Sequence, residues 1–225
     1  MDACEQAIRA AILQGELEVG SRLPPERRMA ESFGVNRVTV RTALARLETH
    51  GLLRVRQGSG YVVRDFRRTG GLELVRDLVD VEPERADELI EDLFVVRRRL
   101  AAIVFERLRG ADLESVRAAI ERFERVVEDE GEDLELAKAD LDVLAALLEA
   151  TGSRVLQLCF NPVMTVVLEL PELRAAMYHA PHENVAGYRA LLQWVQSGAD
   201  VDRMLALLSA RDAQTLERFR AGVKS

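Results

Sequence analysis

The chain has 225 residues, with 31 lysines and arginines against 38 aspartates and glutamates, and a formal net charge of -7 at pH 7. An acidic chain of this kind is not expected to coat nucleic acid indiscriminately, because a general attraction to phosphates is missing. The length exceeds one typical domain, and two cysteines far apart, Cys4 and Cys159, indicate reduced thiols rather than a disulfide framework.

Two helices in close succession are the first elements that the sequence predicts. A short helix over residues 26–32 follows the Pro24-Pro25 pair, which confines the chain. Asn36 provides the N-cap of a second helix, because its side chain accepts the unpaired amide hydrogens of a first turn. Helical spacing turns one face of the second helix inward, at Val40, Ala43, Leu44 and Leu47. The opposite face begins with Arg37, Thr39 and Arg41, whose side chains suit guanine edges, phosphates and thymine methyl groups.

A hairpin follows the second helix. Gly51 ends the helix, and residues 52–56 and 61–64 alternate as two strands around a glycine-rich turn at 57–60. Between Arg27 and Arg64 the sequence has eight arginines and two acidic residues, so this segment alone carries +6. A solvated surface helix beside a hairpin is the alternative interpretation. The order of the motifs and the local positive charge favour a winged helix-turn-helix that binds DNA.

Polar, glycine-terminated residues after the hairpin predict a boundary, with a DNA-binding domain at 1–65, a linker at 66–72 and a second domain at 73–225. The second domain carries helical periodicity over 72–81, 84–108, 111–129, 133–151, 153–170, 183–197 and 200–222. We therefore expect a mostly α protein, with a winged helix-turn-helix followed by an all-α antiparallel helical bundle. The sequence lacks a signal-peptide pattern and a long apolar run, so we expect a cytoplasmic protein.

These motifs resemble the GntR family of bacterial transcription factors, and the helical remainder resembles its FadR/FCD effector-binding domain. Residues 69–78 and 89–97 are similar to the fatty-acid-responsive FadR subfamily within that group. The resemblance implies a homodimer on a near-palindromic DNA operator. It also implies base or phosphate contacts at Arg27, Asn36, Arg37, Val38, Thr39, Arg41, Gln57 and Gly58.

Most members of the family hold a divalent metal with one aspartate and three histidines, and the resemblance aligns Asp140 with that aspartate. Leu144, Tyr188 and Arg211 stand where the histidines are expected. Leucine has no ligand atom and arginine stays protonated, so we expect neither a metal at this site nor another cofactor. A metal bound by Asp140 with the histidines of the 179–182 segment, which is predicted to be a loop, is the alternative.

Helix periodicity turns four polar side chains inward from four different helices: Arg97, Asp140, Tyr188 and Arg211. The neighbours Arg98 and Arg99 are expected to point elsewhere. Buried charges need partners, and two arginines against one aspartate leave one positive charge, which an anionic effector would balance. A fully satisfied internal network, with Asp140 bridged to an arginine and Tyr188 bonded to a carbonyl, is the alternative.

The FadR resemblance implies long-chain acyl-CoA as the effector, held by Arg97 and releasing the protein from DNA. Asp212 and Glu217 occupy positions where that subfamily has a glutamate and a tryptophan among its ligand contacts. A small organic acid is the alternative effector, and an architectural DNA binder without a ligand is a further one. We expect no enzyme, because the sequence lacks a nucleophile elbow, a phosphate-binding glycine loop after a strand, and a histidine beside an acid.

Overall fold

A computed structural model describes residues 3–56, 58, 60–197 and 200–223 of the protein. The chain divides into two compact units, Met1–Ala86 and Asp87–Ser225. Each unit has its own hydrophobic core, so each is described by itself. Within the described ranges, no helix combines the length and the apolar character needed to cross a membrane.

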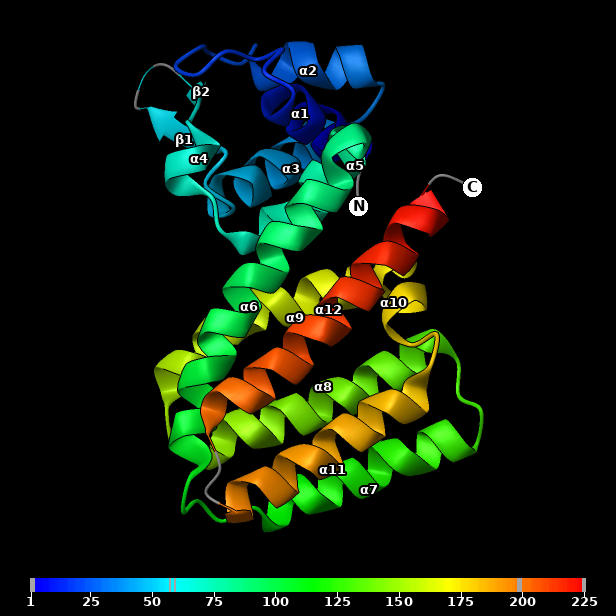
Figure 1. Ribbon diagram of the computed structural model, residues 1–225. Helices are drawn as coiled ribbons and strands as arrows, with labels where there is room; N and C mark the ends of the chain where they lie inside the picture. The colour runs from blue at the N-terminus through cyan, green and yellow to red at the C-terminus, as the bar shows by residue number, and fades with distance from the viewer. Residues whose placement is uncertain (1–2, 57, 59, 198–199, 224–225) are drawn as a thin grey trace. The chain divides into compact units, whose positions relative to one another are not determined.

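The first unit is a winged helix-turn-helix followed by short helices (Figure 1). Its helices are α1 (Ala3–Leu13), α2 (Glu26–Phe33) and α3 (Arg37–Thr49), and its wing is a hairpin of β1 (Leu53–Arg56) and β2 (Gly60–Val63). The strands are antiparallel, with Leu53 opposite Val63 and Arg56 opposite Gly60. After the wing come α4 (Phe66–Thr69), η1 (Leu72–Leu74), α5 (Val75–Val81) and η2 (Pro83–Arg85).

Local signals in the sequence account for the turn between α2 and α3. Gly34 adopts a left-handed conformation at the end of α2, and Asn36 caps α3 by accepting a 2.8 Å hydrogen bond from the Thr39 amide. The inward face of α3 is fully packed, at Val40, Ala43, Leu44 and Leu47. The predicted winged helix-turn-helix is confirmed.

The first unit extends beyond the boundary expected at residue 65. Thr69 on α4 donates a 2.6 Å hydrogen bond to the carbonyl of Gly51, which has a φ of +73° at the end of the α3 turn. Leu74 is buried in the same core as Ile8 and Ile12 of α1. Residues 66–86, expected to be a linker and the start of the second domain, therefore pack with the winged helix. Helix α1, which the sequence analysis did not identify, supplies the apolar face that covers them.

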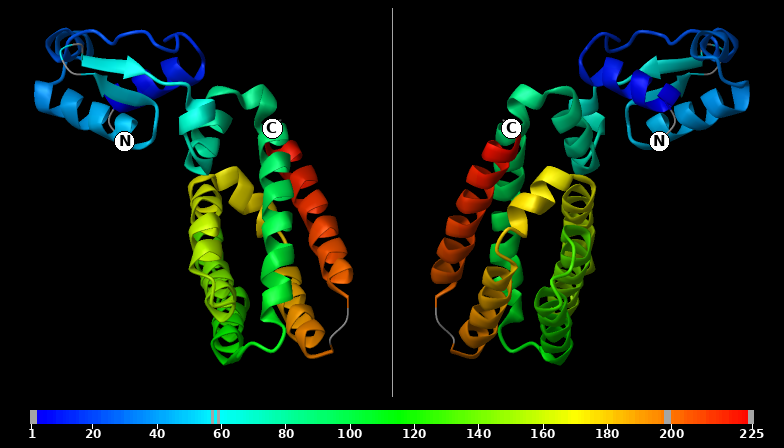
Figure 2. Two further views of the ribbon diagram at one scale, coloured as in Figure 1. Left: turned by 90° about the vertical axis from the view of Figure 1, so that its left-hand side faces the viewer. Right: turned by 90° about the vertical axis from the view of Figure 1, so that its right-hand side faces the viewer.

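The second unit is an all-α bundle, as predicted. Its helices are α6 (Ala86–Leu108), α7 (Glu114–Glu128), α8 (Asp133–Ala150), α9 (Arg154–Glu169), α10 (Pro171–Met177), α11 (Pro181–Ser197) and α12 (Val201–Val223). Helix α7 illustrates the physical basis, because Val116, Ile120, Phe123 and Val127 form one buried stripe. Helices α6 and α12 run side by side in both views of Figure 2.

Helix α10 was absent from the predicted elements. It has seven residues and starts at Pro171, a residue that suits the first turn of a helix but interrupts a periodic pattern. The 179–182 segment, expected to be a loop, is also partly helical, because α11 begins at Pro181 and includes His182 in its first turn. Both differences come from prolines that start helices rather than end them.

Candidate functional site

The N-terminal end of α3 presents polar and apolar groups to solvent. Arg37 and Val38 are exposed, and Thr39 is half-buried. The Asn36 side-chain oxygen accepts hydrogen bonds from both the amide and the hydroxyl of Thr39, the latter at 3.1 Å. The side-chain oxygen of Asn36 is therefore already bonded within the helix cap. A shallow depression runs along the same helix and is lined by Val38, Arg41, Thr42, Ala45, Arg46 and Thr49.

Arg41 is held by an acidic residue of the preceding helix. Its Nη2 lies 2.8 Å from Oε2 of Glu26, and its Nε lies 3.3 Å from Oε1. The hydrogen bonds that Arg41 donates to Glu26 lower the pKa of the Glu26 carboxyl and raise the pKa of Arg41. This two-pronged contact fixes the plane of the guanidinium on the exposed face of α3.

The remaining predicted DNA contacts lie on α2 and the wing. Arg27 is exposed and forms a 3.2 Å ion pair with Glu31 one turn later. Gly58 is exposed at the wing tip, with a φ of +73°. Gln57 lies outside the described residues. The predicted contact residues thus include exposed positions on α2, α3 and the wing, all within the first unit.

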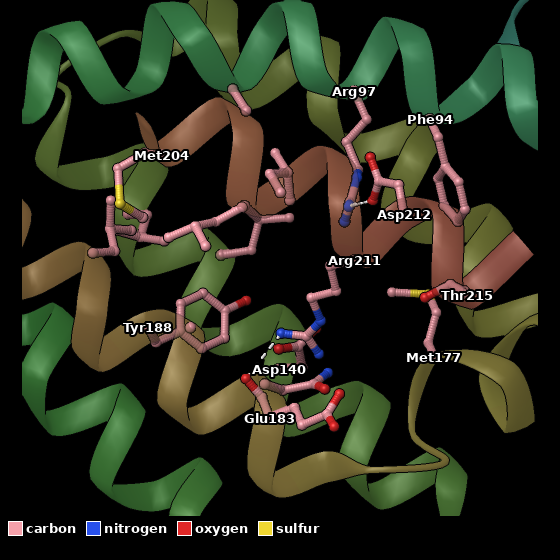
Figure 3. Close-up of a pocket in the computed structure, with 18 of the residues that line it drawn as sticks. Phe94, Arg97, Asp140, Met177, Glu183, Tyr188, Met204, Arg211, Asp212 and Thr215 are labelled. Carbon is pink, nitrogen blue, oxygen red and sulfur yellow. Dashed lines mark hydrogen bonds and ion pairs between the residues drawn. The ribbon is translucent and has the colours of Figure 1, made fainter. Parts of the chain in front are cut away.

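A cavity of about 470 Å³ lies inside the second unit. It is lined mainly by apolar side chains of α6, α8, α9, α11 and α12, among them Phe94, Phe105, Leu144, Phe160, Met164, Leu191, Met204 and Leu207. All five residues predicted to hold an effector line it as well: Arg97, Asp140, Tyr188, Arg211 and Asp212 (Figure 3). Sequence periodicity selected the first four of these side chains and the family resemblance selected Asp212, and all five line the same cavity.

Arg97 is neutralised by a carboxylate on the neighbouring helix. Its Nη2 donates to Oδ1 of Asp212, and Nη1 of Arg98 donates to the other oxygen of the same carboxylate at 2.8 Å. Asp212 is 3% exposed. The expectation that Arg98 points away from these groups was wrong, because α6 and α12 lie side by side and two successive arginines can reach a carboxylate between them.

Asp140 lies at the centre of a second polar group. The hydroxyl of Tyr178 donates a 2.9 Å hydrogen bond to its Oδ2. Burial raises the pKa of the Asp140 carboxyl, and this effect outweighs the hydrogen bonds from Tyr188 and Tyr178 and the positive charges of Arg211 and Arg97. Burial also raises the pKa of both tyrosines well above the ordinary value, so at neutral pH they remain neutral donors.

Arg211 points from α12 toward the first turns of α11. Its Nη1 donates a 3.2 Å hydrogen bond to the backbone carbonyl of Glu183. Burial lowers the pKa of this arginine, while the nearby Asp140 carboxylate opposes the change. In Figure 3 Arg211 lies between the Arg97–Asp212 pair and Asp140. Arg211 therefore bonds a neutral backbone carbonyl, whereas Arg97 bonds the charged carboxylate of Asp212.

The internal-network alternative describes part of this arrangement. Arg97 is paired internally, with Asp212 rather than with Asp140. Asp140 is bonded by tyrosines, and Tyr188 is directed to its carboxylate. The predicted pairs were therefore wrong, although several of the polar groups do bond one another.

The donor set around Asp140 does not fit the metal site of the family. Leu144 offers no ligand atom, Tyr188 contributes a neutral phenol, and the positive charge of Arg211 opposes a cation at this position. Among the described residues no group of three or more histidine, cysteine, aspartate or glutamate side chains has the arrangement of a metal site.

Three polar residues near the cavity were missed from sequence. Tyr178 follows the short helix α10, which was itself not predicted. Arg98 was assigned to another face. Asn184, which lines the cavity, precedes Tyr188 by four residues on α11. Residues four apart share a helix face, so the position of Tyr188 could have identified Asn184.

Comparison with known sequences gives two family matches. Residues 2–63 match the profile described as bacterial regulatory proteins, gntR family, and residues 88–218 match the FCD domain. The HTH-type transcriptional regulator Mce2R of Mycobacterium tuberculosis is 33% identical over 86% of this chain and 80% of its own length.

A protein named fatty acid metabolism regulator, from Shewanella amazonensis, is 32% identical over 70% of this chain. The match covers 64% of that relative, which is less than two thirds of its length. A solved Listeria monocytogenes structure, described as Lar controlling expression of the agr system and mediating virulence, has a TM-score of 0.60. That comparison covers 97% of this chain and 95% of the other at 16% identity, so it shows a shared fold alone.

Proposed function

Because this chain belongs to the GntR family, as a DNA-binding transcriptional regulator with an FCD effector-binding domain, we propose that an anionic effector releases it from its operator. Long-chain acyl-CoA is the leading effector. The DNA-bound form in this proposal is a homodimer on a near-palindromic operator, with the two α3 helices in successive major grooves about 34 to 36 Å apart. The predicted contacts of α2, α3 and the wing carry the DNA binding.

The observation that carries the effector proposal is the cavity of the second unit. Its volume of about 470 Å³ is within the range of about 300 to 1,000 Å³ typical of small-molecule sites. An acyl chain would bury its surface against Phe105, Phe160, Met164 and Leu207, all of which line the cavity. The name of the Shewanella relative, fatty acid metabolism regulator, supports the same class of ligand.

A second candidate, an organic acid, is favoured by the position of Arg211. Acyl-CoA carries its negative charges on the nucleotide, far from the acyl chain. An acid carries its charge at the end of the chain, where Arg211 of the same cavity could bind it. Arg97 is less suited to this role than the sequence implied, because Asp212 already pairs with it.

Release from DNA requires that effector and operator oppose each other. By linkage, the effector must weaken operator binding and the operator must weaken effector binding by the same coupling free energy, typically about 1 to 3 kcal/mol. An architectural DNA binder would have no such coupling. Half-buried arginines around a cavity are also a costly way to build a purely structural core.

The test is a fluorescence-anisotropy titration of the full-length protein on a duplex first selected from random DNA by repeated binding. Saturating palmitoyl-CoA should weaken operator binding by about 5- to 150-fold. Free CoA serves as the control for the nucleotide, and palmitate and short-chain acids test the second candidate. If none of these compounds changes the operator affinity, the effector proposal is wrong.

A further inference from the structure

Asn184, a residue that lines the cavity, has an unsatisfied acceptor. Its residue surface is 4% exposed, and its Oδ1 lacks a hydrogen-bond partner among the described residues. Buried side-chain acceptors are normally bonded, and an unpaired one needs a reason such as a ligand or ordered water. Asn184 lies on the cavity side of α11, four residues before Tyr188.

Arg211 lies against the same turn of α11. It donates to the carbonyl of Glu183, the residue directly before Asn184. A side chain at Gly187 would come within 3.2 Å of Nη1 of Arg211, so the glycine leaves the room that the guanidinium occupies. The hydrogen bond to Glu183 uses one of the five N–H donors of the guanidinium. Asn184 and Arg211 thus both line the cavity, with Arg211 bonded to the residue that precedes Asn184.

The two groups require different partners. Arg211 suits a carboxylate, which accepts two parallel hydrogen bonds from a guanidinium. The Asn184 oxygen needs a donor, and an ionised carboxylate has none. A plain carboxylic acid would therefore leave the Asn184 oxygen unpaired beside a negative charge, whereas a hydroxyl close to the carboxylate would donate to it.

We infer that the acid of the second candidate is a hydroxylated carboxylic acid with an aliphatic chain. Its carboxylate binds Arg211, its hydroxyl donates to Asn184 Oδ1, and its chain lies against the apolar wall that includes Phe105, Phe160 and Met164. This inference rests on the second candidate of the proposed function, an organic acid bound in the cavity. It adds the chemistry of the head group, with Asn184 as the residue that selects the hydroxyl.

A matched pair of acids tests the inference on the full-length protein. Isothermal titration calorimetry would compare 3-hydroxydecanoate with decanoate, which differ by the hydroxyl alone. The hydroxy acid should bind at least about tenfold more tightly, because a site that bonds a hydroxyl discriminates against the analogue that lacks it. Equal affinities of the two acids would overturn the inference.

A variant of Asn184 tests whether this residue causes the preference for the hydroxy acid. Asn184→Leu has nearly the same volume and no acceptor, so the ratio of the two affinities should fall toward one. Asn161→Leu, the same change at an exposed position of α9 outside the cavity lining, is the matched control and should keep the wild-type ratio. Circular dichroism checks the fold of both variants, and the wild-type comparison stands without them. If Asn184→Leu weakens both acids equally, the residue does not select the hydroxyl and the inference fails.

The head-group inference and the proposed function fail differently. If decanoyl-CoA binds and neither acid does, the head-group inference is wrong and the effector proposal survives. If neither acid and no CoA thioester binds, both are wrong. Arg211→Met should weaken both acids by a similar factor, since both carry the carboxylate. An effect confined to the hydroxy acid would contradict the role given to Arg211.

Discussion

Arg9 on α1 donates a 2.6 Å hydrogen bond to the carboxylate of Asp77 on α5, and both side chains are buried. The other Nη of Arg9 bonds Glu5 at 2.7 Å and lies 3.1 Å from Nδ1 of His50, at the end of α3. Arg46 of α3 pairs with the second oxygen of Glu5 at 3.2 Å. One buried cluster therefore joins α1, α3 and α5 within the first unit.

The first prediction concerns this cluster. Asp77→Asn should destabilise the first unit by about 1 to 3 kcal/mol, because Arg9 would lose one of the two carboxylates that it bonds inside the core. Hydrogen exchange of α1 and α5, together with urea unfolding, would measure the loss. The control is Glu31→Gln, which breaks the exposed pair with Arg27 and should cost less than about 1 kcal/mol. Similar losses in both variants would contradict the prediction.

The second prediction divides the DNA contacts by role. Arg37→Ala and Arg41→Ala should each weaken binding to the selected operator by about 5- to 150-fold and binding to random DNA much less, since we expect both arginines to contact base edges. Arg27→Ala should weaken both kinds of DNA more evenly and reduce the salt dependence, as expected of a phosphate contact. Anisotropy titrations on both DNAs at several salt concentrations provide the measurement. A uniform loss on both DNAs for all three variants would rule out this division.

The third prediction concerns the arginines of the cavity. Arg211→Met should abolish the response of the operator complex to effector, because it removes the cation that lacks a carboxylate partner among the described contacts. Arg97→Met should mainly lower the thermal midpoint, because Asp212, 3% exposed, would lose one of its two arginines. Effector titrations and thermal unfolding of both variants separate the two roles. If only Arg97→Met loses the response to effector, then Arg97 and not Arg211 binds the effector.

The fourth prediction is a pH dependence set by Asp140. Burial raises the pKa of this carboxyl above its ordinary value of 3.8. The ionised form is therefore less favourable in the folded protein than in the unfolded chain, and stability is lost as the pH rises from the ordinary value through the folded one.

Asp140→Asn removes this titration. The variant should gain stability relative to the wild type as the pH is raised from acid toward neutral, in urea unfolding at a series of pH values. Asp142→Asn is the matched control, because Asp142 lies on the same helix and is exposed. A difference between Asp140→Asn and the wild type that does not change with pH would refute the assignment.

The fifth prediction tests the metal positions. The purified protein should carry no stoichiometric metal, and chelators should leave its operator affinity unchanged. A triple variant would restore the histidines that the family has at its metal site, with the changes Leu144→His, Tyr188→His and Arg211→His. Together with Asp140 these histidines should bind about one zinc per chain. Elemental analysis measures both proteins. One metal per chain in the wild type would show that Leu144, Tyr188 and Arg211 do not prevent metal binding.

The sequence by itself determined the winged helix-turn-helix, because its signals are local. The Asn36 cap, the inward stripe on α3 and the glycines around the hairpin each act within a few residues. Helical periodicity also determined which faces of the bundle helices turn inward. That is why Arg97, Asp140, Tyr188 and Arg211 were selected from four separate helices and line one cavity.

Only the tertiary structure decided which charges pair. Asp212 neutralises Arg97 across 115 residues of sequence, and Tyr178 reaches Asp140 across 38. Such contacts depend on which helices lie side by side, and periodicity gives the face of a helix without naming its neighbour. The same limit applies to the unit boundary, because residues 66–86 join the first unit through packing against α1. A helix face is a local property, whereas the partner of a buried charge is a property of the assembled core.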